Sequence, residues 1–343
     1  MPIPSRLKRT RSVSDASEVS LPSDSETESG VSREAKNSIY RHTGYNTLMA
    51  SKGSFMHDSS EGPSPEEVQA YTRLLTETTP LPADPLFELQ YLEPLCALLE
   101  ERSELRVCID LHPRLVPSAE ILGWLPAGKF KNLVEGHNDR WLDATVLFQK
   151  LPQPHRTVAY RPSAFTEEEQ RKLDIVSKET STFIVRTGMM FPFFTCEVKC
   201  GKEGLNVADR ANTNSMTIAL RMVVDPHRKA NNVMAVHRKI LGFSISHDGS
   251  DIRVYGHYPE VDGDLTRYFR RTIRKYACTD KGCEDMWTSY RFFWNVCDMF
   301  AHSHLQLIKE AIRRLPDSQS QAKEREAQLA AQHAEIINML RQK

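Results

Sequence analysis

A carboxylate and an ammonium group lie two residues apart near the end of a predicted strand. The run FFTCEVKC, residues 193–200, alternates so that one side is apolar, and Glu197 and Lys199 share the other side. A carboxylate there could hold a divalent metal, and the ammonium could orient a water or stabilise a developing oxyanion. These are the two tasks of a phosphodiester-cleaving site. The alternative is a charged pair on the solvated side of a half-buried strand, because Glu-x-Lys is a short motif.

The segment after this strand has the pattern of an amphipathic helix. Its polar side carries Asn206, Arg210, Thr213, Asn214, Thr217 and Arg221. Asn and Thr cost helix propensity, so a polar side next to a charged strand end predicts a lined cleft. We expect Arg210 and Asn214 to contact nucleic acid there. A helix side that only faces solvent would more typically carry Lys, Glu and Gln.

A second basic group follows in DLTRYFRRTIRKYA, residues 264–277, which we predict to be an amphipathic helix. One side of that helix would carry Arg267, Arg270, Arg271, Arg274 and Lys275. Clustered Arg and Lys side chains suit contacts with phosphate groups. The alternative is a solvated side whose charges pair with acids from elsewhere in the fold.

Composition limits the classes of protein that fit. The 343 residues include 45 basic and 45 acidic side chains, so a net charge of zero gives no global attraction to nucleic acid or membrane. No long apolar run and no secretory signal pattern occurs, and the 7 cysteines are an odd number, so we expect reduced cysteines in an intracellular protein without a membrane span. Cys278 and Cys283 lack a second close Cys/His pair, which excludes a zinc finger as the main interpretation.

The chain divides into three predicted parts. Residues 1–80 are rich in Ser and acidic side chains and are predicted to be a disordered tail. The tail opens with a basic cluster, Arg6, Lys8, Arg9 and Arg11, which is a nuclear-import signal, a phosphate-seeking arm or simply part of a solvated tail. Residues 81–316 are predicted to form one α/β domain, and residues 317–343 a helical or disordered C-terminal tail.

Several elements of the domain have local signals. Helices are predicted after Asp84, at 117–125 after the cap Ser118, at 165–179 after the cap Thr166, and at 304–315. Strands are predicted at 105–111, 141–149 and 156–161. Asp248-Gly249 between two alternating runs predicts a hairpin, and the aromatic run 287–300 fits helix or strand.

Long stretches resemble a large family of uncharacterised fungal proteins. They are RPSAFTEEE, PFFTCEVKCGKEGLNVADRANTNSMTIALRMVVD, ILGFSISHDGSDIRVYGHYPEVDGD and TRYFRRTIRKY. The resemblance covers about Leu86 to Pro316. The family's core is similar to the PD-(D/E)xK nuclease superfamily, which implies a mixed β-sheet flanked by helices, a restriction-endonuclease-like core. It also implies an acid on one strand and Glu-x-Lys on the next.

Residue by residue, the resemblance assigns only half of such a site. Glu197 and Lys199 match Glu-x-Lys, and Arg210 or Asn214 could match a polar position on the next helix. Where Pro-Asp would stand, this chain has PQPHRTVAY. His155 there could ligate a metal, whereas Arg156 would repel one. The other candidate carboxylates are those of Asp143, Glu93 and Glu100.

Two functions therefore stay open. In the first, the domain binds nucleic acid and cleaves it with Mg²⁺ held by Glu197, with Asp143 or His155 completing the ligand set, while Lys199 assists the water. In the second, it is a catalytically inactive nuclease-fold module that serves interaction with protein or nucleic acid. The sequence leaves substrate, protein partners and oligomeric state open, and nuclear residence depends only on the basic cluster.

Overall fold

The computed structural model describes residues 39–82, 88–123, 130–173, 182–200, 204–278, 285, 287–315 and 332. The predicted cap at Asp84, the N-terminal basic cluster, Cys283 and all of the C-terminal tail except residue 332 lie outside these ranges. Within the described ranges, no helix combines the length and the apolar character that crossing a bilayer requires.

One mixed, open β-sheet organises the described residues. Its strands are β1 (Leu133–Gly136), β2 (Arg156–Tyr160), β3 (Ile184–Arg186), β4 (Met189–Val198), β5 (Gly242–His247), β6 (Asp251–Asp262) and β7 (Leu265–Ala277). Their order is β1-β2-β4-β5-β6-β7, and β3 pairs with β4. Only β4 and β5 are parallel among the pairs described. The prediction of a single α/β domain with a mixed sheet is thus confirmed.

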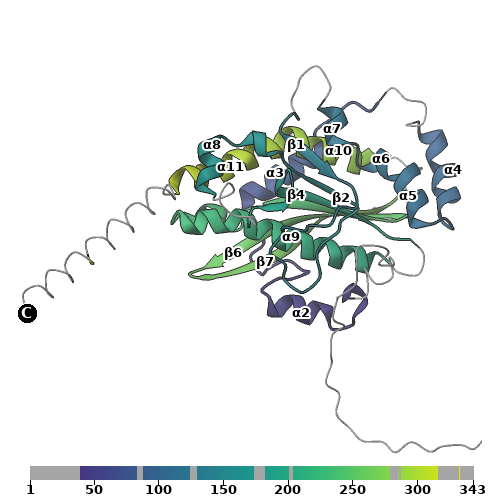
Figure 1. The fold of residues 1–343 in the computed structure, drawn as a ribbon. Helices are drawn as coiled ribbons and strands as arrows, with labels where there is room; N and C mark the ends of the chain where they lie inside the picture. Colours follow the sequence, from purple (N-terminus) through teal and green to yellow (C-terminus); the bar gives the residue numbers. More distant parts are fainter. Residues whose placement is uncertain are drawn as a thin grey trace, which may run out of the picture. The chain divides into compact units, whose positions relative to one another are not determined.

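Helices cover both faces of this sheet (Figure 1). The long helix α9 (Leu205–Lys229) connects the parallel strands β4 and β5 and packs on one face, with α2 (Tyr45–Ser51) beside it. On the other face lie α3 (Pro65–Thr76), α10 (Trp287–Asn295), a π-helical segment (Val296–Phe300) and α11 (Ala301–Arg314). A parallel pair needs such a crossover helix, which explains why the longest helix follows β4 directly.

The two faces of β4 are buried by different chemistry. The Phe194 ring packs 4.8 Å from that of Phe293 in α10, measured between centroids. The next side chain, Thr195, points to the opposite face and donates a 2.8 Å hydrogen bond to Asn212 in α9. Asn212 in turn donates to the backbone carbonyl of Ile245 in β5. The α10 face is therefore an aromatic core, whereas the α9 face is held by buried polar groups.

The predicted tail of residues 1–80 is too long. Residues 45–51 and 65–76 form α2 and α3, and Tyr45, Met49 and Leu74 are part of the core. The Ser64 hydroxyl caps α3 in front of Pro65. The Ser-rich composition of the first residues does not extend to these short amphipathic helices, whose apolar residues are few but buried.

The prediction of a helix at 264–277 is wrong, because these residues form β7. The turn Gly263-Asp264 joins β6 to β7, and Gly263 has a φ of 56°, which glycine adopts without strain. The segment is rich in aromatic and β-branched residues that favour strands. Its helical spacing of apolar residues was therefore the weaker signal.

Two predicted strands are also wrong. Residues 104–110 form the helix α5, which follows α4 (Leu89–Leu99, containing Pro94) and precedes α6 (His112–Leu115). Residues 141–149 form turns and bends rather than a strand, with the Trp141 indole donating to Thr157. Other predictions are confirmed by β2, the Asp248-Gly249 hairpin, α11, α7 (Ala119–Leu122) after Ser118 and the capped α8 (Glu167–Lys172). The ends of the helices predicted at 117–125 and 165–179, residues 124–125 and 174–179, lie outside the described ranges. The aromatic run 287–300 is helical.

Candidate functional site

The sheet brings His155 beside Glu197. His155 directly precedes β2, and β2 pairs with β4 so that Arg156 lies opposite Cys196. The neighbouring pair, His155 and Glu197, points to the other face of the sheet. The imidazole Nδ1 lies 2.7 Å from the Glu197 Oε2 atom, which is a hydrogen-bonded ion pair.

A second carboxylate completes the group. Glu104, the first residue of α5, places its Oε1 atom 2.8 Å from the His155 Nε2 atom. The Lys199 ammonium donates to Glu104 Oε2 at 3.3 Å and to the Val198 carbonyl at 2.9 Å. The four side chains form a linear network, Glu197–His155–Glu104–Lys199, which we call the Glu-His-Glu-Lys network.

Because the residues of this network are buried, the charge of each one strongly affects the pKa of its neighbours. Glu197 is 5% exposed and Lys199 2% exposed. Burial alone would raise the pKa of Glu104, but the hydrogen bond from His155 and the nearby Lys199 lower it to about 2. Burial disfavours a charged His155, yet its bonds to Glu104 and Glu197 outweigh this and raise its pKa. The carboxylate of Glu104 and the imidazolium of His155 therefore stabilise each other's charged forms.

The structure brings together three of the predicted site residues, Glu197, Lys199 and His155. Arg156 points to the opposite face, where its guanidinium donates to the carbonyls of Val116 and Pro117 at 2.7 Å. It therefore does not fill the space beside Glu197.

The other candidate carboxylates do not join the site. Asp143 lies in the turn after Trp141, and no hydrogen bond or ion pair joins it to Glu197 among the described contacts. Glu93 and Glu100 are exposed at α4. Sequence reasoning missed Glu104, although Ser103 followed by Glu104 has the composition of a helix start; we had assigned the next residues to a strand.

The oxygen and nitrogen atoms of the network that could bind a metal ion do not converge on one point. The two nitrogens of an imidazole point in different directions, so Glu104 and Glu197 lie on opposite sides of the His155 ring. Among the described residues, these donors form no group of the compactness that one ion needs. Glu104, His155 and Glu197 are chemically suitable for Mn²⁺ or Mg²⁺, but binding would require the imidazole to leave its place between the carboxylates.

The predicted polar side of α9 is covered rather than open. Arg210 donates to the backbone carbonyl of Tyr40 at 2.7 Å and lies over the Tyr45 ring at 5.7 Å from its centroid. Asn214 is buried, and its amide donates to the Tyr40 hydroxyl at 3.4 Å. Residues 40–52, which we predicted to be tail, thus occupy the expected cleft.

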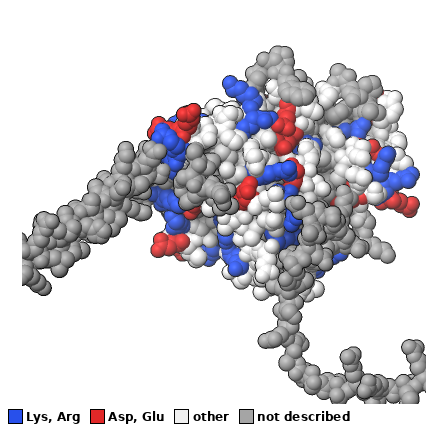
Figure 2. All heavy atoms as spheres, in the orientation of Figure 1, with Lys and Arg blue, Asp and Glu red and all other residues white. Residues whose placement is uncertain are grey.

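The basic residues of β7 do not share one side. A strand alternates, so Arg270 is buried towards α9, stacked 4.0 Å from the Tyr255 ring centroid, whereas Arg271 pairs with Asp58 on the other face. Arg274 pairs with Asp285 at 3.1 Å and Arg267 with Asp262 at 4.0 Å. The Lys275 ammonium lies 5.9 Å from the centroid of the Tyr255 ring. On the face shown in Figure 2, basic and acidic side chains are interspersed.

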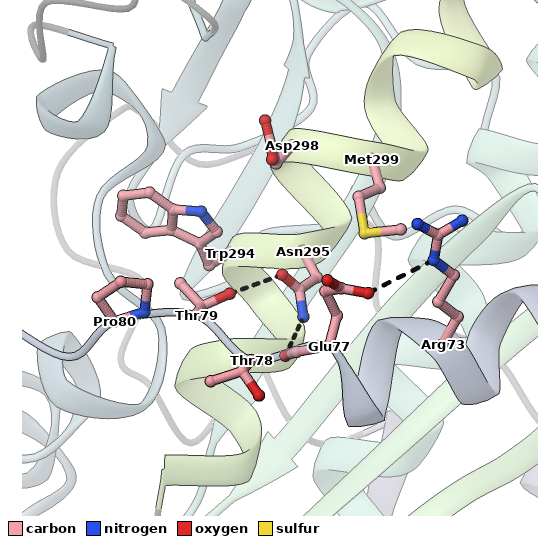
Figure 3. Close-up of a pocket in the computed structure, with 9 residues that line it drawn as sticks. All are labelled: Arg73, Glu77, Thr78, Thr79, Pro80, Trp294, Asn295, Asp298 and Met299. Carbon is pink, nitrogen blue, oxygen red and sulfur yellow. Dashed lines mark hydrogen bonds and ion pairs between the residues drawn. The ribbon is translucent and has the colours of Figure 1, made fainter.

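Two cavities lie away from the network. One of about 310 Å³ lies between the end of α3 and the π-helical segment, where Asn295 points between Thr79 and Glu77 (Figure 3). The other, of about 510 Å³, is lined by residues that include His57, Glu260 and Arg267. Neither lining includes a residue of the Glu-His-Glu-Lys network.

Comparison with known proteins gives a family without an assigned activity. No curated protein matches the sequence. The model of a domain of unknown function, DUF7924, matches residues 91–312, which include the whole network and all seven strands. The chain therefore belongs to the DUF7924 family.

Proposed function

We propose that this protein is a catalytically inactive, nuclease-like module that acts through interaction with protein or nucleic acid. The observation that carries the proposal is the position of His155. Both of its ring nitrogens are bonded to the carboxylates of the site, and the resemblance to PD-(D/E)xK nucleases would place an acid at this point of the sequence.

The arrangement around Glu197 supports a relationship to that nuclease fold. Glu197 and Lys199 lie at the end of β4, the antiparallel neighbour β2 begins beside them, and α9 follows β4 within the mixed sheet. Glu104 on α5 adds a second carboxylate close to the same point. These are the residue types of a metal-dependent phosphodiesterase, with His155 in place of one acid.

The charges explain why such a site would not bind Mg²⁺. The carboxylates of Glu104 and Glu197 supply two negative charges, and Lys199 with a protonated His155 supplies two positive ones. The imidazolium already occupies the position between the carboxylates where a cation would be attracted. A hydrated Mg²⁺ ion dehydrates reluctantly and would have to displace both hydrogen bonds of His155. The network thus favours a closed structural role over catalysis.

One substitution tests this proposal directly. His155→Asp would remove the imidazole, add a third carboxylate and leave space for an ion. We expect no Mg²⁺ or Mn²⁺ binding by calorimetry in the native protein and saturable binding in His155→Asp. His155→Asn is the matched control, since it has the same size as Asp but no charge, and we expect it to bind no ion. The double variant His155→Asp/Glu197→Gln should lose the gained binding.

The same measurements distinguish the second candidate, a metal-dependent nuclease. The Glu-x-Lys pair on β4 with Glu104 beside it favours that candidate. Mn²⁺ or Mg²⁺ binding by the native protein, lost in Glu197→Gln and accompanied by cleavage of DNA or RNA, would overturn the inactive assignment. Absence of binding in folded His155→Asp would show that more than His155 closes the site.

A further inference from the structure

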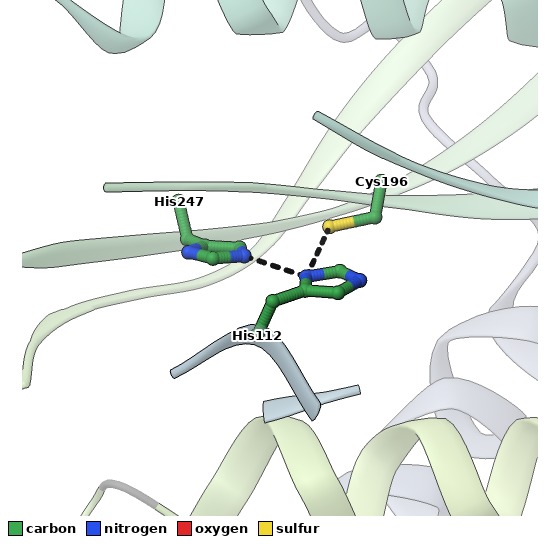
Figure 4. Close-up of side chains that lie close together, drawn as sticks. All are labelled: His112, Cys196 and His247. Carbon is green, nitrogen blue, oxygen red and sulfur yellow. Dashed lines mark hydrogen bonds between the residues drawn. The ribbon is translucent and has the colours of Figure 1, made fainter. Parts of the chain in front are cut away.

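A second group of ligand-type side chains lies on the opposite face of β4. His112 at the start of α6, Cys196 in β4 and His247 at the end of β5 are all buried and point toward one another (Figure 4). The His112 Nδ1 atom lies 2.9 Å from His247 Nε2 and 3.9 Å from Cys196 Sγ. One donor atom from each residue lies within 4.8 Å of the other two. Imidazole nitrogen and thiolate sulfur are the ligands that zinc prefers.

These spacings fit a tetrahedral ion. Zinc binds nitrogen at about 2.0–2.1 Å and sulfur at about 2.3 Å, which places two nitrogens about 3.3 Å apart and a nitrogen and sulfur about 3.6 Å apart. The two distances from His112 Nδ1, 2.9 Å to His247 Nε2 and 3.9 Å to Cys196 Sγ, differ from those values by less than about half an ångström. The three donor atoms all lie within 4.8 Å of one another, so side-chain rotation must bring the His247 and Cys196 donors to the spacing of a bound ion.

The hydrogen bonding of His247 orients it as a ligand. Its Nδ1 atom lies 3.3 Å from the Asp248 carbonyl, which can only accept, so Nδ1 carries the proton. The Nε2 atom then presents its lone pair to His112 Nδ1, which donates the 2.9 Å hydrogen bond between the two rings. When an ion binds, the His112 proton must move to the Nε2 atom of the same ring. A ligating histidine characteristically donates its other ring N–H to such a carbonyl.

Burial and a nearby charge define the surroundings of the group. His112, Cys196 and His247 are all buried, and ion binding must displace the thiol proton of Cys196. The charge of the nearby Arg156 is compensated by Glu135, at 3.4 Å.

This group is separate from the Glu-His-Glu-Lys network. Cys196 and Glu197 are consecutive residues of one strand, so their side chains point to opposite faces of the sheet. Glu197 binds His155 on one face, whereas Cys196 approaches His112 on the other. The consequence of an ion here would be a link between the short helix α6 and the central strands β4 and β5.

We propose that His112, Cys196 and His247 bind one Zn²⁺ ion through Nδ1, Sγ and Nε2, respectively. The three side-chain donors leave the fourth tetrahedral position for a water or a small ligand, as in zinc sites with three protein ligands. The ion attaches α6 to the sheet centre, so it stabilises the fold.

The test measures the metal content and cobalt spectrum of the full chain. The protein is dialysed against Zn²⁺, passed through gel filtration and analysed by elemental mass spectrometry. We expect a stoichiometry close to one zinc per chain, its loss in Cys196→Ser, and its retention in Cys297→Ser, another buried cysteine outside the group. Replacement by Co²⁺ should give a thiolate-to-cobalt charge-transfer band in the native protein and in Cys297→Ser, but not in Cys196→Ser.

His112→Gln provides a second variant if Cys196→Ser does not fold, and it should lose the ion as well. A metal-free native protein after this treatment would overturn the proposal. So would zinc that persists in folded Cys196→Ser and His112→Gln but is lost in Cys283→Ser. Because His155→Asn adds no carboxylate and alters only the other face of the sheet, it should leave the zinc content unchanged, which separates this result from the test of the inactive site.

Discussion

The His155 imidazole lies 2.7 Å from the Glu197 carboxylate on one side and 2.8 Å from the Glu104 carboxylate on the other. A single ring thus joins the end of β4 to the first turn of α5. These elements are distant in the sequence, and the contact between them helps to hold the helices α5 and α6 against the sheet. It also takes up the carboxylate oxygens that a catalytic cation would need.

The network should stabilise the fold within a defined pH window. The folded-state pKa of Glu104, about 2, is below its ordinary value of 4.5, so its contribution is present above pH 4.5 and is lost as pH falls through 2. The pKa of His155 is raised above 6.5, so its contribution is present below pH 6.5 and is lost as pH rises through the folded-state pKa. The hydrogen bond between Glu104 and His155 contributes to both pKa shifts, so its contribution to the stability of the fold is counted only once.

Glu104→Gln tests that window. Chemical denaturation of the native protein and the variant should differ most in unfolding free energy between pH 4.5 and 6.5, with the difference shrinking on either side. Glu93→Gln, on the exposed side of α4, is the control and should follow the native profile. A difference that is constant across the pH range would contradict the assigned ion pairing.

The basic residues of β7 should contribute little to nucleic-acid binding. Arg271 and Arg274 already pair with Asp58 and Asp285, so releasing them to phosphate would leave acids uncompensated. We expect Arg271→Gln/Arg274→Gln to bind duplex DNA as the native protein does across a salt titration in a fluorescence anisotropy assay. Weaker binding with a shallower salt dependence would instead identify β7 as a phosphate-contacting surface. Arg161→Gln, away from β7, is the control.

Asn295, the last residue of α10, should be important for stability because its side chain connects α10 to the end of α3. Its amide donates to the Leu74 and Glu77 carbonyls at 2.9 and 3.1 Å, and its oxygen accepts from the Thr79 hydroxyl at 2.7 Å. Asn295→Ala leaves these buried groups without partners and should cost about 1–3 kcal/mol in urea unfolding. Thr79→Val removes one of the three bonds and should cost less. Equal losses in the two variants would show that the bonds to α3 contribute nothing.

Gly242 at the start of β5 should not tolerate a larger side chain. A Cβ atom there would lie 2.8 Å from the Phe193 carbonyl oxygen of β4, a backbone atom that cannot move without disturbing the parallel pair. Gly242→Ala should therefore destabilise the protein by roughly 1–3 kcal/mol in thermal unfolding. Gly249→Ala is the control, because its nearest neighbour would be 3.5 Å away, and its change should stay within about 0.5 kcal/mol. Similar melting temperatures for both variants would refute the close approach of β4 and β5 at this point.

The sequence by itself determined the local structure around the site. Alternation in residues 193–200 predicted that Glu197 and Lys199 share one side of a strand, and β4 has that geometry through Val198. Asp248-Gly249 predicted the hairpin, and Thr166 and Ser118 predicted two helix caps. These signals are reliable because each depends on neighbours within a few residues, where backbone sterics and local hydrogen bonds dominate.

Only the tertiary structure decided what those residues meet. Whether 264–277 is helix or strand depended on pairing with β6 rather than on its apolar spacing. Three sets of contacts join segments that lie tens of residues apart in the sequence. They are the contacts of Glu104 and His155 with Glu197, those that cover Arg210, and those of His112 with Cys196 and His247. Such contacts are set by strand order, register and helix packing, which the spacing of residues along one chain does not encode.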